Sequence, residues 1–209
     1  MSSWKRKTER HHQLGDQARE FAVYEVTLTD HKLQNLRQLA KQTYLQHEKN
    51  PHSKYENTLQ GHLLGHMGEG SAAVFFVDHQ WECQVVADDR TPDLRVRTPA
   101  GTELRIACKT WNRNRFWVEN SRCIRPEQRE STVIEHDAIL WLRAMAWLDK
   151  EQVGNVVDLV CWSLPSEIPQ DTVMTGPPLV LLKNHRVPLD QARDMSTFIS
   201  HWDPATPTS

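Results

Sequence analysis

The chain has 209 residues, with 25 Lys and Arg against 27 Asp and Glu, and its formal net charge is −2 at pH 7. This length suits one domain. The near balance of charge excludes binding to nucleic acid through a global basic field, so any such binding needs a local basic patch. The four Cys residues lie far apart without a CxxC pair, which argues against a zinc ribbon or a disulfide scaffold.

The first residues, MSSWKRKTERHHQLGDQ, are polar and lack the apolar run of a signal peptide. No apolar stretch of the sequence approaches the ~20 residues that a membrane span requires. We therefore expect a cytoplasmic protein with reduced thiols and no membrane partner. We expect residues 1–20 to be a flexible N-terminal segment, residues 21–203 to be the domain and residues 204–209 to be a polar tail.

The first half of the domain shows a strand followed by two helices. FAVYEVTL (21–28) has strand composition, and Thr29 or Asp30 is suited to cap a helix that ends at residue 47. A second helix is expected over 54–77, although each of its glycines costs about 1 kcal/mol in a helix interior. WECQVVAD (81–88) is expected to be a strand.

The second half consists mainly of strands. We expect a hairpin over 93–110, a loop with a short helix over 112–132, and a last helix over 191–202 that Asp190 caps. Three further strands are expected over 138–147, 156–164 and 177–184. This order of elements predicts a mixed α/β layer fold in a single domain.

The hairpin places charged residues on one face. Side chains alternate along a strand, so Asp93, Arg95 and Arg97 share a face on the first arm. On the second arm the same face carries Glu103, Arg105, Ala107 and Lys109. A five-residue loop, TPAGT (98–102), pairs Arg97 with Glu103, Arg95 with Arg105, and Asp93 with Ala107. The residues Asp93, Ala107 and Lys109 should therefore converge at the open end of the hairpin.

These residues carry a resemblance to a known family. PD at 92–93, a turn, and an apolar strand ending at Lys109 resemble the motif of the PD-(D/E)XK nuclease superfamily. GHMGEGSAAVFF (65–76) resembles the helix that precedes this motif in many members, with Glu69 as its acid. HDAILWLRA and VVDLVCWSLPSE resemble the two strands that commonly follow. The resemblance covers roughly residues 55–185 and implies a restriction-endonuclease-like mixed β-sheet flanked by helices.

The resemblance also implies a chemistry. Enzymes of this kind hydrolyse phosphodiester bonds with Mg²⁺ or Mn²⁺ held by hard oxygen ligands. Asp93, position 107 and the main-chain carbonyl of Cys108 would bind this metal. Glu69 would complete the outer metal sphere or a second metal site, and Lys109 would orient or deprotonate the attacking water.

The departure from the family pattern is Ala107, whose methyl group cannot bind a metal. An engineered change of Glu or Asp to Ala is one explanation, and the intact Asp93 and Lys109 favour it. A natural pseudo-nuclease that binds nucleic acid without cutting it is the second. A displaced acid is the third, for which Glu69 is better placed than Glu103.

Nucleic-acid contacts are expected around the hairpin. Between Leu94 and Val118 there are six basic residues and one acid, a local net charge of +5. The facing pair Arg95 and Arg105 is unfavourable unless an anion, a phosphate or a carboxylate, lies nearby. Trp111 and Trp117 flank Arg113 and Arg115, an arrangement that suits base stacking and phosphate contact. The alternatives are ordinary surface arginines and tryptophans buried under the sheet edge.

We therefore predict a metal-dependent DNA endonuclease of restriction or defence type, inactivated at position 107, that acts as a homodimer or within a larger defence complex. The alternative is a naturally inactive nuclease-fold module that binds nucleic acid. A third hypothesis is a metal hydrolase that uses His62 and His66, which lie on one helical face with Glu69.

Overall fold

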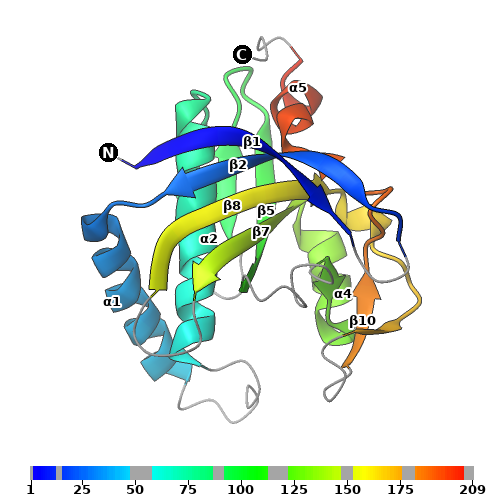
Figure 1. Ribbon diagram of the computed structural model, residues 1–209, viewed down its shortest axis with the longest axis horizontal. Coiled ribbons are helices and arrows are strands. Elements are labelled where there is room, and N and C mark those ends of the chain that lie inside the picture. The colour runs from blue at the N-terminus through cyan, green and yellow to red at the C-terminus, as the bar shows by residue number, and fades with distance from the viewer. Residues whose placement is uncertain are drawn as a thin grey trace.

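The computed structural model describes residues 2–12, 16–47, 58–86, 92–112, 122–146, 153–175 and 182–204. Within these ranges eight strands form one mixed sheet and three form a smaller one. Helices lie on both sides of the large sheet (Figure 1). The predicted class, α/β with a mixed sheet flanked by helices, is confirmed at this level. None of the helices in these ranges is long and apolar enough to cross a membrane.

The large sheet has the order β1-β2-β8-β7-β5-β4-β3, and β11 pairs with β8. β7 runs parallel to β5, whereas the other neighbours are antiparallel. The strands of this sheet are β1 (Ser3–His11), β2 (Arg19–Thr27), β3 (Glu82–Val85), β4 (Leu94–Arg97), β5 (Glu103–Asn112), β7 (Ala138–Ala146), β8 (Val153–Ser163) and β11 (Arg193–Asp194).

The remaining elements cover the two faces of this sheet. In Figure 1, α1 and α2 lie side by side on one face, while α4 and β10 lie on the other. These elements are α1 (Asp30–His47), α2 (Leu59–Asp78), α4 (Pro126–Glu135), α5 (Phe198–Trp202), the 3-10 helices η1 (Pro165–Glu167) and η2 (Met195–Thr197), and the small sheet of β6 (Cys123–Ile124), β10 (Leu182–Arg186) and β9 (Val173–Thr175).

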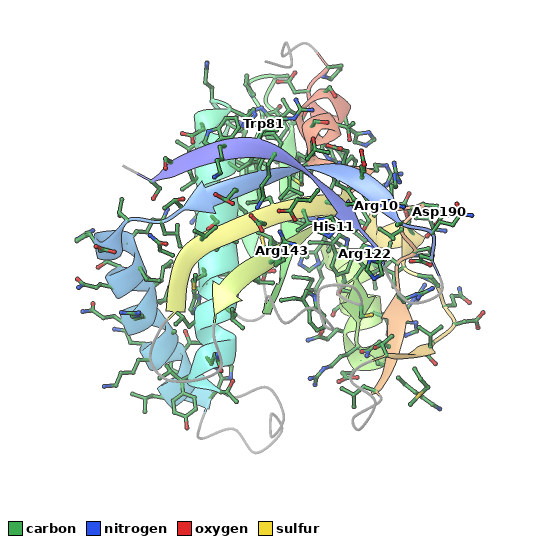
Figure 2. The ribbon with its side chains drawn as sticks, in the orientation of Figure 1. Arg10, His11, Trp81, Arg122, Arg143 and Asp190 are labelled. Atoms are coloured by element: carbon green, nitrogen blue, oxygen red, sulfur yellow. The ribbon has the colours of Figure 1, made fainter. Side chains whose placement is uncertain are left out.

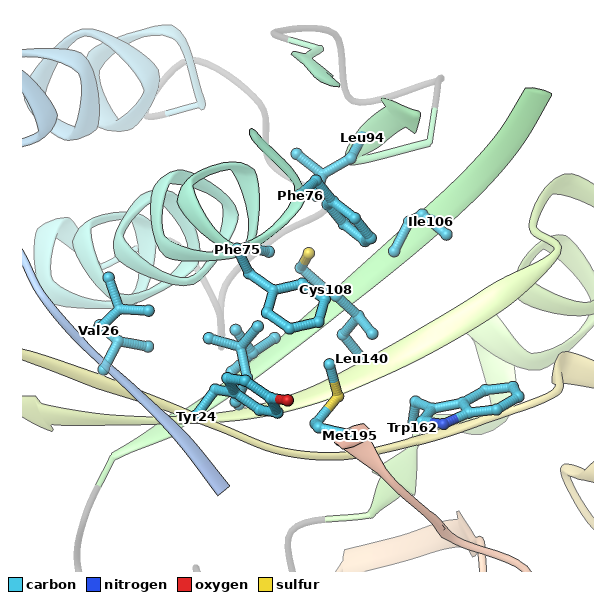
Figure 3. Packing of buried hydrophobic residues seen from close by; sticks show 14 of the residues in the cluster. Tyr24, Val26, Phe75, Phe76, Leu94, Ile106, Cys108, Leu140, Trp162 and Met195 are labelled. Carbon is cyan, nitrogen blue, oxygen red and sulfur yellow. The ribbon is translucent and has the colours of Figure 1, made fainter. Parts of the chain in front are cut away.

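Each face of the sheet has its own hydrophobic core. Under α2, the rings of Tyr24 and Phe75 meet edge to face with centroids 5.0 Å apart (Figure 3). Across the sheet, Ala107, Ile139 and Trp141 belong to the second core. Burial of a large apolar side chain stabilises the fold by about 1.5–3 kcal/mol. The alternation of β5 and β7 between the two cores fixes which residues face α2.

Helix α2 lies unusually close to β5. A Cβ atom at Gly68 would lie 1.8 Å from Oγ1 and 3.0 Å from the Cβ of Thr110, so only glycine permits this contact. The neighbouring residue on the helix is Glu69, whose approach to the sheet therefore depends on Gly68. The helix begins at a Thr58 N-cap, whose side chain accepts a hydrogen bond from the Gly61 N–H at 3.0 Å.

The hairpin of β4 and β5 has the predicted register. Arg95 pairs with Arg105 and Arg97 pairs with Glu103. The loop closes with a hydrogen bond from the Thr98 N–H to the Thr102 carbonyl, and Gly101 adopts a φ of 89° that favours glycine. Alternation along the two arms, together with this turn, was sufficient to specify the pairing.

The expectation of a flexible segment over residues 1–20 is wrong for Ser3–His11. This segment forms β1 and pairs with β2 from Ser3–Thr27 to His11–Arg19. The polar composition of this segment did not indicate a strand. Its charges are nevertheless paired in the sheet, where the ammonium groups of Lys5 and Lys7 each lie 2.9 Å from the Glu25 carboxylate.

The expectation of one helix over 191–202 capped by Asp190 is also wrong in its first part. Arg193 and Asp194 form β11, paired with Trp162 and Cys161 of β8. The cap is Asp194, which accepts a hydrogen bond from the Ser196 N–H at 2.8 Å as η2 begins. The second oxygen of Asp194 accepts from the Ala22 N–H at 2.6 Å, a tertiary bond that holds this segment on the sheet.

The contact at Gly68 gives the first prediction. Gly68→Ala should lower the free energy of unfolding by about 1–3 kcal/mol, because the added methyl group overpacks the contact with Thr110. The matched control is Gly65→Ala, where the nearest atom, Glu69 Oε1, lies at 3.8 Å, so the helix should gain stability instead. Urea unfolding of both variants measures this. Equal effects at the two positions would show that α2 does not depend on close contact at Gly68.

Candidate functional site

The carboxylate of Asp93 is fixed to the main chain of β5. Asp93 directly precedes β4, and its Oδ2 accepts a hydrogen bond from the Cys108 N–H at 2.6 Å. The ladder between β4 and β5 ends at the pair Leu94–Ile106, so the side chain of Asp93 takes the place of the next ladder bond. A carboxylate therefore lies at the open end of the hairpin, beside the peptide of Cys108.

Ala107 and Lys109 share one face of β5 but differ in exposure. Ala107 is fully buried and packs in the second core, paired with Ile139 of β7. Lys109 is partly exposed and pairs with Trp141. Within the described ranges, no hydrogen bond or ion pair of the Lys109 ammonium is found. The ammonium is therefore available to an anion.

Glu69 is held by partners on the helices rather than by the hairpin. Its Oε2 lies 3.0 Å from Nδ1 of His66, and Nε2 of His66 lies 3.0 Å from Oγ1 of Thr43 on α1. His66 therefore orients the acid and joins it to α1. The electrostatic effect of Glu69 reaches the Cys108 thiol, whose pKa is raised by burial and by the charges of Asp93 and Glu69.

Of the two facing arginines, Arg105 has a carboxylate as its partner. Asp137, which precedes β7, accepts hydrogen bonds from the Arg105 N–H at 2.7 Å and from its Nε at 3.2 Å, and pairs with NH2 at 3.1 Å. The Asp137 N–H in turn donates to the Arg105 carbonyl at 2.8 Å. These bonds attach the junction between α4 and β7 to β5, two residues before Ala107.

A cleft of about 570 Å³ lies over the exposed arms of the hairpin. Its charged lining consists of three arginines and three acids: Arg95, Arg97, Arg105, Glu82, Glu103 and Asp137. The acids come from β3, β5 and the start of β7, so the strong positive charge along the sequence is neutralised here. Arg95 has no acidic partner within 4 Å in the described part of the chain.

The structure describes only some of the tryptophan and arginine residues that were predicted to contact nucleic acid. Trp111 is partly exposed near the end of β5, in register with Arg143 of β7. Arg113, Arg115 and Trp117 lie outside the described residues. Of the predicted nucleic-acid contacts, Arg95, Arg105 and Trp111 are therefore located, and they lie on the face that also carries Lys109.

His136 is a functional candidate that the sequence analysis missed. It follows the C-terminus of α4, where its Nδ1 donates to the Thr132 carbonyl at 3.2 Å. Burial lowers the pKa of His136; the charge of Asp93 acts in the opposite direction, and that of Lys109 contributes to the lowering. The imidazole is thus within electrostatic range of both predicted site residues, and its hydrogen bond is to α4. No sequence pattern indicated this residue, because its position follows from the contact between Asp137 and Arg105.

A buried ionic network was also missed. The Lys7 ammonium lies 2.7 Å from Glu9, 2.9 Å from Glu25 and 3.0 Å from Asp158, which is 1% exposed. Arg143 binds both Asp158 and Glu9. Burial opposes ionisation of Glu9, but its bonds with Lys7 and Arg143 outweigh this and lower its pKa to about 2. Removal of one partner from such a network leaves an uncompensated charge.

His11 lies at one end of this network, near Arg143 (Figure 2). It is 7% exposed, and its Nε2 has no hydrogen-bond partner in the described structure, although it lies 3.4 Å from Glu9 Oε2. Burial, reinforced by the Arg143 charge, lowers the pKa of His11 to about 4. The imidazole is therefore neutral in the folded protein at neutral pH.

The residues present do not fit the expected magnesium site. Mg²⁺ requires near-ideal octahedral oxygen coordination and is commonly anchored by carboxylates. Position 107 supplies a methyl group, and Glu69 is bonded to His66. No group of three or more His, Cys, Asp or Glu side chains in the described ranges is arranged to hold a metal ion. The His62 and His66 face likewise forms no such group.

Comparison with known proteins does not add to this geometry. No family model, curated protein sequence or solved structure matches the chain. The assignment of a function therefore depends on the arrangement of the chain's own residues.

His11 gives a prediction of pH dependence. Its pKa is about 4 when folded and 6.5 ordinarily, so the unfolded chain binds more protons between these values and stability falls as pH drops through this window. The loss between pH 7 and pH 5 should be about 2 kcal/mol, at ~1.36 kcal/mol per pKa unit. His11→Asn should remove this loss, whereas His31→Asn on exposed α1 should keep it. Urea unfolding at both pH values is the measurement; identical pH slopes in all three proteins would contradict it.

Proposed function

We propose that this protein binds DNA through a nuclease-type core, and that hydrolysis by this core requires an acid at position 107. The observation that carries the proposal is the arrangement of the hairpin. The carboxylate of Asp93 is bonded to the β5 main chain at Cys108, and Lys109 follows on the same strand. A carboxylate and an ammonium group thus flank position 107, as the PD-(D/E)XK resemblance implies.

The order of the elements supports the same proposal. Helix α2 with Glu69 precedes the antiparallel strands β3, β4 and β5, and β7 returns parallel to β5 after α4. This is the order that a restriction-endonuclease-like sheet would have. The parallel pairing of β7 with β5 adds to the sequence resemblance, which had already suggested a helix before the motif and strands after it.

The chemistry of this face suits phosphate binding. The ammonium of Lys109 and the guanidinium of Arg95 have no acidic partner in the described part of the chain, and both lie on the face that carries Ala107. Lys and Arg side chains supply the sequence-independent part of affinity for DNA through contacts with phosphates. With Ala107 in place, the residues bind the backbone but lack the ligand set for hydrolysis.

A second candidate is a natural binding module that never hydrolyses its ligand. The full burial of Ala107 favours this candidate, because a longer side chain would have to displace atoms of the second core. A carboxylate placed in an apolar environment costs several kcal/mol unless it is paired. The two candidates differ in what an acid at position 107 does.

The decisive experiment introduces this acid. Ala107→Glu and the smaller Ala107→Asp are incubated with supercoiled, linear and single-stranded DNA in Mg²⁺ and in Mn²⁺. We expect at least one variant to cut DNA, with no cutting by the Ala107 protein and none in EDTA. Ala107→Gln is the matched control, because it adds the same volume as Glu without the charge.

Circular dichroism and urea unfolding establish that each variant is folded. If folded acidic variants bind DNA but do not cut it, the natural binding module is the correct candidate. If neither the Ala107 protein nor any variant binds DNA, the proposed function is wrong as a whole.

A second experiment locates the phosphate contacts. Arg95→Gln should weaken duplex binding at low salt and reduce the slope of log affinity against log salt by about 0.9, the value for one lost phosphate contact. The matched control is Lys41→Gln on the exposed surface of α1, across the sheet, which should bind as the parent does. Fluorescence anisotropy with a labelled duplex at several salt concentrations measures both. Equal slopes for Arg95→Gln and the parent would exclude this face as the phosphate contact.

A further inference from the structure

The amine of Lys32 contacts helix α2 without an acidic partner. Lys32 lies in the first turn of α1, and its Nζ donates a hydrogen bond to the Gly70 carbonyl of α2 at 3.1 Å. Within the described ranges, no carboxylate oxygen lies within 4 Å of this amine, whereas the Lys7 ammonium has three acids at that distance. A carbonyl oxygen is a neutral acceptor, which binds a neutral amine as well as an ammonium group. The hydrogen bond therefore positions the amine without stabilising its charge by an ion pair.

Burial and the helix dipole both oppose a positive charge on Lys32. Burial lowers the pKa of the amine, although the charges of Cys83 and Asp78 act in the opposite direction. The first turn of a helix carries the positive end of the peptide dipoles, which is unfavourable for a cation. The side chain is also packed, since a Cβ atom at Gly70 would lie 3.6 Å from Lys32 Cε. These effects favour the neutral amine, the form in which lysine acts as a nucleophile.

A cleft of about 670 Å³ opens beside Lys32, which belongs to its lining. The cleft lies between α1 and α2, which are side by side on the face of the sheet that carries the core under α2 (Figure 1). Its apolar wall consists of Leu36, Ala73, Val74 and Val77. Small-molecule sites commonly combine such apolar walls with a few polar groups that determine specificity. The amine of Lys32 is a group of this kind.

We propose that Lys32 forms an imine with aldehydes that carry an apolar chain, and that the apolar wall of the cleft binds this chain. The lone pair of Nζ attacks the carbonyl carbon, and the carbonyl oxygen becomes a hydroxyl group as it takes up one proton. This hydroxyl group takes up a second proton and leaves as water while the carbon–nitrogen double bond forms. The amine loses two protons, and the departing water carries two. No atom is oxidised or reduced, so the reaction needs no other reactant.

An uncharged aldehyde matches this cleft better than an acid with the same chain. Asp78 belongs to the lining, and its carboxylate disfavours a second negative charge in the cleft. The carbonyl carbon of an aldehyde reacts with a neutral amine, which is the form that burial favours at Lys32. The site also lies across the sheet from Ala107 and its core, so the proposal does not depend on DNA binding.

The test compares two aldehydes on the full chain. Hexanal and acetaldehyde are added separately at neutral pH with sodium cyanoborohydride, which reduces an imine to a stable amine, and mass spectrometry of the peptides gives the rate at each lysine. The ratio of the hexanal rate to the acetaldehyde rate should be about tenfold higher at Lys32 than at Lys41, the effect of burying roughly two methylene groups. Lys41 is the matched control, because it is exposed on the same helix. Equal ratios at the two lysines would overturn the proposal.

A pair of variants tests the wall of the cleft. Val77 is 58% exposed, so Val77→Ser should fold, and it should lower the rate ratio at Lys32 toward that at Lys41. Leu45→Ser is the control, because Leu45 is 48% exposed on α1 but does not belong to the lining of the cleft. Urea unfolding establishes that both variants are folded. If the ratio at Lys32 is unchanged in folded Val77→Ser, the wall does not bind the chain and the proposal is wrong.

Discussion

The structure depends on the direct contact between α2 and β5. Gly68 brings the helix so near to Thr110 that another residue fits only if the Thr110 side chain, the helix or the strand moves. This contact sets the depth of the core under α2, in which Phe75 and Phe76 are almost fully buried. It also sets the height of Glu69 above the sheet, where His66 then holds the carboxylate. One position without a side chain thus permits the close approach of α2, the helix that also carries Glu69, to β5.

Local patterns were sufficient to predict the hairpin and the two helices α1 and α2. The register of β4 and β5 follows from strict alternation, because a slip by one residue would expose Leu94 and bury Arg95. The start of α1 was also predicted, and Thr29 Oγ1 accepts a hydrogen bond from the Lys32 N–H at 3.3 Å there. In these segments the local sequence and the packed sheet favour the same conformation.

The remaining features depend on contacts between distant residues. β1 has a polar sequence, and its charged side chains have partners on other strands. Lys7 pairs with Asp158 of β8, and Glu9 pairs with Arg143 of β7. The carboxylate that neutralises Arg105 comes from Asp137, 32 residues along the chain. A partner so distant in the sequence leaves no periodic pattern. The sequence therefore indicated that an anion was needed near the facing arginines but not which residue would supply it. His136 was missed for the same reason, since its position follows from that ion pair.

Folding and catalysis place different requirements on position 107. The buried site in the second core suits an apolar residue, whereas the proposed hydrolysis requires an acid. A carboxylate at this buried position would lie in an apolar core, where only a cation close by would offset its desolvation. Lys109 points along the same face but remains partly exposed, and a bound metal would be the other source of positive charge. An acid would therefore couple the stability of β5 to metal binding. With alanine, β5 carries no buried charge at position 107, and the ammonium of Lys109 has no acidic partner within the described ranges, so it can bind an anionic ligand without also having to stabilise a buried carboxylate.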